Sequence, residues 1–284
     1  MKDTDQIRNN EYLNDFIKEN GLSDAFVSDN SGTFLRVLRS REACRNCSGL
    51  EECCQPSKGE RLVLTYDQVL IEEVEYCDHA LQKLGKDQLR NRYVYCDVPE
   101  NLITLDLNSV RYTEDQKQLY LRLAAILHKK TDRGLYVSGD LGTGKTYLCT
   151  ALANSLVRNG EKVAFVKVSN FFNEMKSYYG SASEMIDRNI AVLKNAAYLF
   201  LDDIGSETVS EFVRDDILFR ILDHRMENRK MTIFTSNLNK EELLKHYQYD
   251  RREKSNLMNA RRLMERIDIL SDSFVLSGPN MRRG

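Results

Sequence analysis

The sequence lacks a strong excess of charge, a long apolar run and an internal repeat. Its 284 residues carry 41 Lys and Arg against 43 Asp and Glu, a formal net charge of -2. The net charge of the chain therefore does not attract nucleic acid, and any nucleic-acid-binding site must come from a local concentration of basic residues. No apolar run is long enough to span a membrane, and the polar start at residues 1–6 lacks the apolar core of a signal peptide. These absences predict a cytoplasmic protein without a membrane partner.

The composition and the length predict two soluble domains. Hydrophobic residues make up 42% of the chain and charged residues 30%, which suits a packed core under a charged surface. The length exceeds that of a usual single domain. Helical periodicity fades around Pro99, and a capping box at 113–116 then begins a helix that runs to about Lys130. We place an N-terminal domain at 1–95, a linker at 96–112 and a C-terminal domain at 113–284.

Cysteine is scarce in the second half of the chain, where Cys149 stands alone, whereas six cysteines precede residue 100. A reducing compartment disfavours disulfides within such a cluster. The spacing C-x2-C-x5-C is typical of a structural zinc site, which demands four ligands. We expect a small, mainly helical N-terminal domain that binds Zn2+ through Cys44, Cys47, Cys53 and Cys77.

The fourth zinc ligand has alternatives. Cys77 is preferred because Cys54 is adjacent to Cys53 and geometrically awkward. Cys54, His79 and Cys96 remain alternatives for the fourth ligand, and free cysteines in a small helical domain remain the alternative to any metal.

Helical and strand patterns alternate beyond residue 113, as a doubly wound α/β domain requires. Helices are expected at 145–159, at 210–228, and near Glu241 and Asn259. Short apolar strands are expected at 135–138, 163–168, 198–201, 231–235 and 273–276. The fold class is therefore α/β, a parallel sheet flanked by helices.

A glycine-rich loop between the first of these strands and the first helix matches G-x-x-x-x-G-K-T. Glycines let several backbone N–H groups point at one anion, and the helix N-terminus adds positive partial charge. Lys145 would neutralise the β- and γ-phosphates of ATP, and Thr146 would be a ligand of Mg2+. The predicted nucleotide-binding residues are Gly139, Leu141, Gly142, Thr143, Gly144, Lys145 and Thr146.

Polar side chains end two further strands. Asp202 and Asp203 follow the strand at 198–201, at the carboxyl edge where ligands of open α/β sheets bind. We assign Asp202 to Mg2+, and Asp203 to orienting or deprotonating the attacking water. Asn237 follows the strand at 231–235 and could position that water. Such strand ends are common turns, so both assignments depend on the P-loop.

Two arginines lie four positions apart, at Arg262 and Arg266, on one face of a predicted helix. An arginine that reaches the γ-phosphate of a neighbouring subunit would stabilise the transition state and make hydrolysis depend on assembly. A solvated basic helix face is the equally weighted alternative.

A candidate surface for single-stranded nucleic acid combines cations with aromatic rings. The stretch 251–266 is locally basic. The residues singled out are Lys167, Lys176, Tyr178 and Tyr179. An ordinary surface is the more frequent origin of such a mixture.

The P-loop, the acidic strand end and Asn237, in this order, resemble the Walker A, Walker B and sensor-1 elements of AAA+ ATPases. A small-molecule kinase would add an Arg-rich lid, which the sequence lacks. Over nearly its whole length the chain resembles the bacterial replicative helicase loaders of the DnaI type, and more distantly DnaC. The segments that carry the resemblance are the C-x2-C-x5-C motif and residues 142–146, 201–205, 213–216, 235–237 and 260–267.

The resemblance implies an ATP-dependent loader that docks on a hexameric DnaB-type helicase through its N-terminal zinc domain. It also implies binding of single-stranded DNA and self-association through the AAA+ domain. Arg262 and Arg266 would serve as arginine finger and sensor 2, without an order between them. One departure is Arg61, near the place where the family can have a histidine ligand.

Two rival functions remain. A transposition helper ATPase of the IstB kind shares the AAA+ core, but the cysteine motif disfavours it. A nucleotide-gated adaptor that binds ATP without hydrolysing it is disfavoured by Asp202, Asp203 and Asn237.

Overall fold

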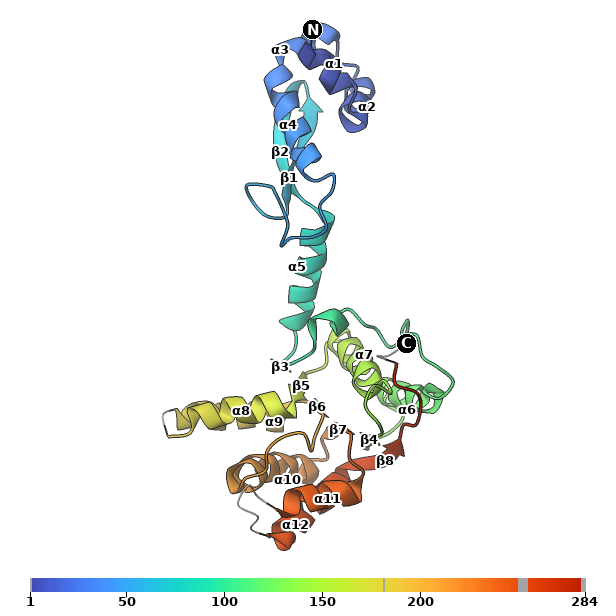
Figure 1. Ribbon diagram of the computed structural model, residues 1–284, viewed down its shortest axis with the longest axis vertical. Coiled ribbons are helices and arrows are strands. Elements are labelled where there is room, and N and C mark those ends of the chain that lie inside the picture. The colour runs from blue at the N-terminus through green and yellow to red at the C-terminus, as the bar shows by residue number, and fades with distance from the viewer. Residues whose placement is uncertain (1, 181, 250–254, 282–284) are drawn as a thin grey trace. The chain divides into compact units, whose positions relative to one another are not determined.

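The computed structural model describes residues 2–180, 182–249 and 255–281 and divides the chain into two compact units, Met1–Asp87 and Gln88–Gly284 (Figure 1). Within these described ranges, no helix has the length and apolar character needed to cross a bilayer.

The N-terminal unit packs short helices against an antiparallel hairpin. Its core is apolar, with Leu13, Phe34 and Val37 among the fully buried side chains. The helices are α1 (Lys2–Arg8), α2 (Glu11–Glu19), α3 (Asp24–Asp29), α4 (Ser31–Ala43) and α5 (Asp78–Arg90), the last of which crosses the unit boundary. The hairpin strands are β1 (Glu60–Asp67) and β2 (Val69–Tyr76).

The hairpin is absent from the sequence-based prediction, which found only helices here. Leu62 and Leu64 of β1 point into the core with the period of two expected of a strand. The turn, however, lies at Gln68, whose φ is 59°. Hairpin turns of this backbone type usually carry Asn or Gly, so the usual signal for a hairpin is missing.

The C-terminal unit is built on a six-stranded sheet with the order β3-β5-β6-β7-β4-β8, and every pair of neighbours is parallel. This confirms the prediction of a parallel sheet flanked by helices. The strands are β3 (Tyr95–Cys96), β4 (Gly134–Ser138), β5 (Val163–Lys167), β6 (Tyr198–Asp202), β7 (Met231–Ser236) and β8 (Ser271–Val275).

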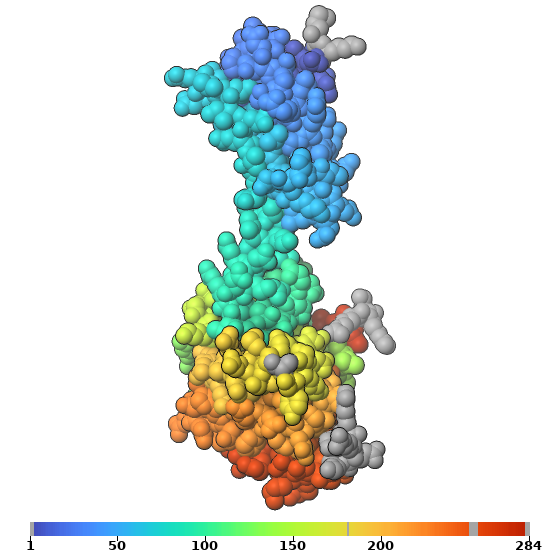
Figure 2. Space-filling view, turned by 90° about the vertical axis from the view of Figure 1, so that its left-hand side faces the viewer, coloured from blue at the N-terminus to red at the C-terminus, as the bar shows by residue number. Residues whose placement is uncertain are grey.

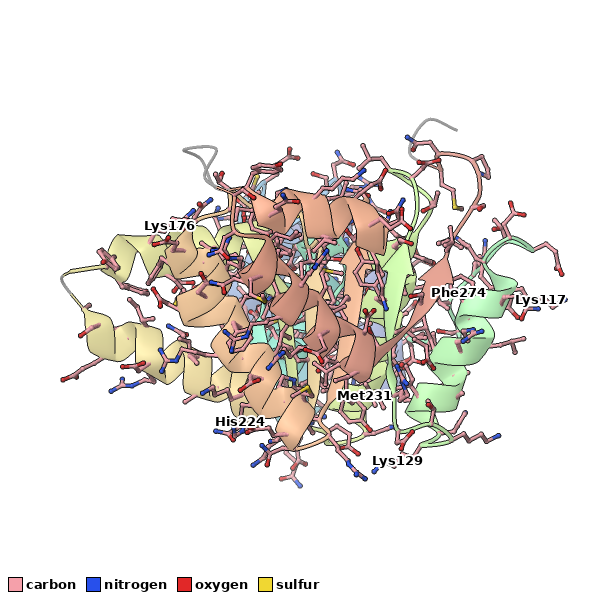
Figure 3. All side chains as sticks on the ribbon, turned by 90° about the horizontal axis from the view of Figure 1, so that it is seen from below. Lys117, Lys129, Lys176, His224, Met231 and Phe274 are labelled. Atoms are coloured by element: carbon pink, nitrogen blue, oxygen red, sulfur yellow. The ribbon has the colours of Figure 1, made fainter. Side chains whose placement is uncertain are left out.

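Alternate strand residues face two separate cores. On β6, Phe200 packs with α6 and α7, whereas Leu199 and Leu201 pack with the helices from α8 to α12. Phe274 of β8 lies on the α6 side, where Arg122 stacks over its ring (Figure 3). The helices are η1 (Glu100–Leu102), α6 (Lys117–Leu127), α7 (Lys145–Arg158), α8 (Val168–Tyr178), α9 (Ser183–Asn195), η2 (Phe212–Phe219), α10 (Arg220–Glu227), α11 (Lys240–Gln248) and α12 (Leu257–Leu270).

Residues 96–112, expected as a linker, pack within the C-terminal unit. Val98, Ile103 and Leu107 are buried against α7 and its neighbours. Asn154 of α7 donates hydrogen bonds to the carbonyls of Leu102 and Leu105, at 2.9 and 3.0 Å. The apolar residues of this segment have irregular spacing, so neither helical nor strand periodicity reveals their burial.

The predicted helix at 210–228 is continuous but not uniform. Its first half, η2, is a π-helix, and α10 continues it without a break. A π-helix is rare and recurs at functional sites, and apolar spacing does not distinguish it from an α-helix over two turns.

Arg225 of α10 is fully buried and connects this helix to β7 and to the C-terminal end of α9. Its guanidinium donates to Thr232 Oγ1 at 2.9 Å and to the carbonyls of Leu193 and Ala196 at 2.8 Å each. No acidic side chain of the described chain forms a salt bridge with it. The carbonyl acceptors satisfy its donors in place of a counterion.

We predict that Arg225→Met lowers the free energy of unfolding by about 3 kcal/mol, because several buried acceptors lose their donors at once. The control is Arg220→Met in the same helix, whose exposed ion pair with Asp187 contributes less than about 1 kcal/mol. Urea unfolding of both variants measures the difference, and equal effects would contradict the assigned role of Arg225.

Candidate functional site

The functional residues gather at the carboxyl edge of the sheet, where the P-loop connects β4 to α7. A cavity of about 670 Å3 opens there. Its phosphate end is lined by Gly142, Gly144, Lys145, Thr146, Asp202, Asp203 and Asn237. The structure therefore brings together most of the residues that the sequence predicted for ATP and Mg2+.

The P-loop has the shape of an anion cradle. Gly142 and Gly144 have φ values of 83° and 100°, a region that residues with a Cβ rarely adopt. Lys145 Nζ donates to the carbonyls of Gly139 and Asp140, at 2.7 and 2.8 Å. Its ammonium group is thus fixed along the loop, as neutralisation of bound phosphates requires.

Asp202 is held by two hydroxyl groups at the end of β6. Thr146 Oγ1 donates to Asp202 Oδ1 at 2.8 Å, and Thr235 Oγ1 donates to the same oxygen at 2.7 Å. Burial raises the pKa of Asp202, and the two hydroxyl donors oppose that effect. A buried carboxylate beside a threonine hydroxyl provides the oxygen ligands that Mg2+ prefers.

Asn237 joins the P-loop to the second acid. Its Oδ1 accepts from Lys145 Nζ at 2.9 Å, and its Nδ2 donates to Asp203 Oδ1 at 2.9 Å. Asp203 has a φ of 61°, and its N–H donates to Thr235 Oγ1 at 2.9 Å. The amide therefore sets the orientation of both charged groups that would face a γ-phosphate.

Several residues of the cavity were not predicted. Thr235 was quoted only as part of a strand end, although its hydroxyl contacts both acids. Further residues that line the cavity are Pro99, Leu102, Arg111, Gln116, Tyr147 and Met281. No local motif marks these residues, because tertiary packing brings them to the loop.

A buried polar chain extends from the acidic strand end to α12. The carboxylate of Glu207 accepts from Gly205 N at 2.8 Å and from the hydroxyl of Tyr247. Arg214 of η2 then donates to the carbonyl of Tyr247 at 3.0 Å and pairs with Asp215 at 2.8 Å. Asp215 also accepts from Asn259 Nδ2, at the start of α12, at 3.1 Å.

Arg262 and Arg266 lie on α12, outside the cavity. Both guanidinium groups pack over the ring of Phe219, 4.7 and 4.6 Å from its centroid. Arg266 also pairs with Asp223 at 3.0 Å. Neither arginine lines the nucleotide cavity of its own chain.

The four candidate DNA-binding residues do not form one cluster. Lys167 precedes α8 and lines the nucleotide cavity, whereas the other three lie at the far end of this 11-residue helix, about 15 Å away. Figure 3 shows Lys176 on α8, and Figure 2 shows the α8–α9 surface in yellow above the orange surface of η2 and α10. Tyr179 packs edge-on against Phe212. Residues 251–254 of the basic stretch lie outside the described residues.

The cysteines of the N-terminal unit form a pair rather than a complete zinc site. The N–H groups of Gly59 and Gln55, and to a smaller extent the neighbouring thiol of Cys47, lower the pKa of Cys53. Cys77 N donates to the carbonyl of Gly59 at 2.8 Å. Among the described residues, no three His, Cys, Asp or Glu side chains form a group that could hold a metal ion.

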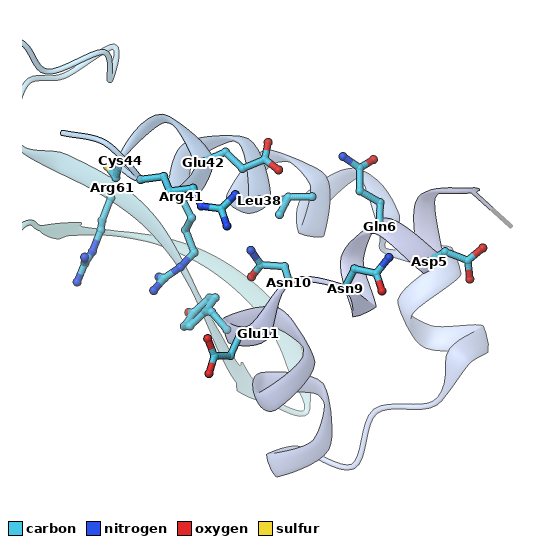
Figure 4. A pocket seen from close by; sticks show the side chains of 12 residues that line it. Asp5, Gln6, Asn9, Asn10, Glu11, Leu38, Arg41, Glu42, Cys44 and Arg61 are labelled. Carbon is cyan, nitrogen blue, oxygen red and sulfur yellow. The ribbon is translucent and has the colours of Figure 1, made fainter.

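Cys44 and Cys96 are engaged elsewhere. Cys44 Sγ accepts from Gln55 Nε2 at 3.1 Å and lines a cavity of about 870 Å3 with Arg41 and Arg61 (Figure 4). Cys96 belongs to β3 of the other unit, where burial raises the pKa of its thiol.

A family model described as IstB-like ATP binding protein matches residues 88–272. The replicative helicase loader DnaI of Bacillus subtilis is 27% identical over 277 residues, which cover 94% of this chain and 88% of that protein. The loader DnaC of Escherichia coli K12 is 31% identical over 108 residues. This match covers 38% of the chain and 44% of DnaC, so it spans less than half of that relative.

Solved structures give the same relationship. A structure of DnaI has 30% sequence identity and a TM-score of 0.55, and the match covers 68% of this chain and 98% of that one. A structure of the DnaC helicase loader, at 20% identity and a TM-score of 0.51, supports the fold alone. The predicted resemblance to helicase loaders is confirmed.

We predict that Asp202→Asn stabilises the nucleotide-free protein while it lowers the affinity for ATP with Mg2+ at least tenfold. Burial raises the pKa of Asp202, so its charged form opposes folding at neutral pH and its protonated form does not. Urea unfolding should show a gain for the variant at pH 7 that shrinks as the pH falls through the pKa of Asp202. A gain that grows on acidification would contradict this assignment.

Proposed function

Because the chain belongs to the IstB-like ATP binding protein family, we propose that it is an ATP-dependent loader of a replicative helicase onto single-stranded DNA. The observation that carries the proposal is similarity to DnaI over 94% of the chain, which includes the N-terminal unit. The family model by contrast begins at residue 88. A transposition helper of the IstB kind would share only that second part, so the loader is favoured.

The proposed reaction is hydrolysis of ATP at the P-loop. Bound Mg2+ would neutralise charge on the phosphates, next to Thr146 and Asp202. Lys145 faces the β- and γ-phosphates, and Asp203, oriented by Asn237, positions the attacking water. The intact pair of acids favours hydrolysis over an adaptor that only binds nucleotide.

Full activity in this proposal requires a second subunit. Arg262 and Arg266 lie outside the cavity of their own chain, which suits a role in trans. Arg266 is tied to Asp223 and to the carbonyl of Arg262. The Arg262 guanidinium stacks on Phe219 and forms no hydrogen bond or ion pair with a side chain or backbone group of the described residues. We assign the arginine finger to Arg262 and a supporting role, in place of sensor 2, to Arg266.

The N-terminal unit is proposed to bind a hexameric DnaB-type helicase and Zn2+. The contact between Cys47 and Cys53 supports half of the metal site. Cys77 flanks this pair through Gly59, which supports it as the fourth ligand in preference to Cys96. Cys44 would complete the set after release from Gln55.

DNA binding is proposed for the surface at the C-terminal end of α8. Lys176, Tyr178 and Tyr179 lie together at the end of α8 and combine a cation with two aromatic rings. Lys167 is reassigned to the nucleotide cavity that it lines.

The loader proposal is tested with the full chain, a replicative helicase and single-stranded DNA. We expect co-purification with the helicase, and an ATPase rate that helicase and single-stranded DNA raise. Stronger binding to duplex than to single-stranded DNA, without helicase binding, would favour the transposition rival and contradict the loader.

We predict that Arg262→Ala lowers the stimulated ATPase rate about 1,000-fold while ATP affinity stays within twofold, because the finger acts on a neighbour. A mixture of the Arg262→Ala and Lys145→Ala chains should have a higher ATPase rate than either variant alone. The Arg262→Ala chain supplies an intact P-loop, and the Lys145→Ala chain supplies the arginine finger. Arg261→Ala, at the adjacent exposed position, is the matched control. A mixture no faster than its components would rule out action in trans.

We predict one bound zinc per purified chain, lost in Cys47→Ser and in Cys53→Ser. Cys54→Ser should retain the metal, because the Cys54 side chain is exposed and outside the contacting pair. Elemental analysis measures the metal content. Metal-free wild-type protein, or equal loss in the Cys54 variant, would contradict the assignment.

A further inference from the structure

The P-loop is held from outside by a segment that follows β8. Residues 276–281, here called the strap, run alongside the loop, starting with Leu276 N, which donates to the carbonyl of Ser138 at 2.7 Å. A Cβ on Gly139 would collide with the carbonyl of Leu276, and one on Gly142 would collide with the Asn280 side chain. The strap is therefore in van der Waals contact with two of the three P-loop glycines.

Two hydrogen bonds fix carbonyl groups of the loop. Met281 N donates to the carbonyl of Gly142 at 3.1 Å. Gln116 Nε2 donates to the carbonyl of Thr143 at 2.8 Å and contacts Met281 Sδ at 3.2 Å. Gln116 is almost fully buried, 2% exposed, and its Oε1 accepts from Thr113 N at 3.0 Å. Strap and glutamine therefore form one contact network on the outside of the loop.

The planarity of the peptide bond gives these contacts a consequence for phosphate binding. In a trans peptide, the carbonyl of one residue and the N–H of the next point in opposite directions. A Gly142 carbonyl held outward by Met281 therefore turns the Thr143 N–H to the opposite side, toward the cradle. In the same way, the hydrogen bond from Gln116 to the Thr143 carbonyl turns the Gly144 N–H toward the cradle.

We propose that the strap and Gln116 are positioning elements of the phosphate site, which preset the Thr143 and Gly144 N–H groups to bind nucleotide phosphates. The proposal rests on the ATP-binding function proposed above. Because the strap acts on the loop itself, its loss weakens binding of any polyphosphate and not only of ATP. By linkage, a bound nucleotide stabilises the docked strap by the same factor.

The test compares ATP with inorganic triphosphate, each with Mg2+, by isothermal titration calorimetry on the full chain. A variant truncated after Gly278 should lose about tenfold in affinity for both ligands. Met281→Pro removes the N–H that contacts Gly142 and should lose a similar factor, whereas Met281→Ala keeps it and should lose less than threefold. Truncation also removes two arginines, so the double variant Arg282→Ala/Arg283→Ala is the control for their loss. It keeps the strap and should bind both ligands as the wild type does.

Hydrogen exchange gives a second readout, since amides of the strap should exchange more slowly with bound nucleotide. Thermal unfolding checks that every variant is folded. Unchanged or tighter binding of both ligands to the truncated and Met281→Pro chains would overturn the proposal, and so would a loss confined to ATP. Failure of the wild-type chain to bind ATP would instead overturn the proposed function, and the strap proposal with it.

Discussion

The nucleotide site depends on one side-chain amide, that of Asn237, which contacts a cation and an anion at once. Lys145 reaches it from the P-loop and Asp203 from the end of β6. The two groups belong to segments that are separated by a strand and several helices in the sequence. Parallel pairing of β4, β6 and β7 brings their carboxyl ends to one edge, so the sheet order is what allows the amide to reach both.

The surrounding structure supports this edge from both faces. α7 is buried over nearly its whole length against one side, which fixes the helix whose N-terminus forms the phosphate cradle. On the other side, Arg225 and the chain of Glu207, Tyr247 and Arg214 are buried polar groups with satisfied hydrogen bonds. Such groups specify a single arrangement of the helices, since any displacement leaves a buried donor or acceptor without a partner.

The sequence predicts those site residues whose role follows from a local sequence motif. The P-loop, Asp202 and Asn237 follow from glycines and polar residues at the ends of apolar strands, and the structure brings them together. Gln116 and Met281 could not be predicted, because their contact joins residues 165 positions apart. Nothing in the local sequence of either indicates a role at the loop.

The fold is predictable to a similar extent and for the same reason. The strands of the large sheet have continuous apolar runs, whereas the hairpin turns at Gln68, without Asn or Gly, and the segment at 96–112 is buried by tertiary contacts alone. The zinc prediction rests on the cysteine spacing alone, because no three His, Cys, Asp or Glu side chains of the described residues form a group that could hold a metal ion.

The π-helix η2 determines the direction in which the Phe219 side chain points, and Arg262 stacks on the ring of Phe219. An α-helical residue turns the chain by about 100°, and a π-helical turn accommodates one more residue than an α-helical one. Phe219, on which Arg262 and Arg266 stack, is the last residue of this wide helix. A length change of a single residue within 212–219 would rotate Phe219 away from α12. The chain can thus tolerate substitution in this helix more readily than insertion or deletion.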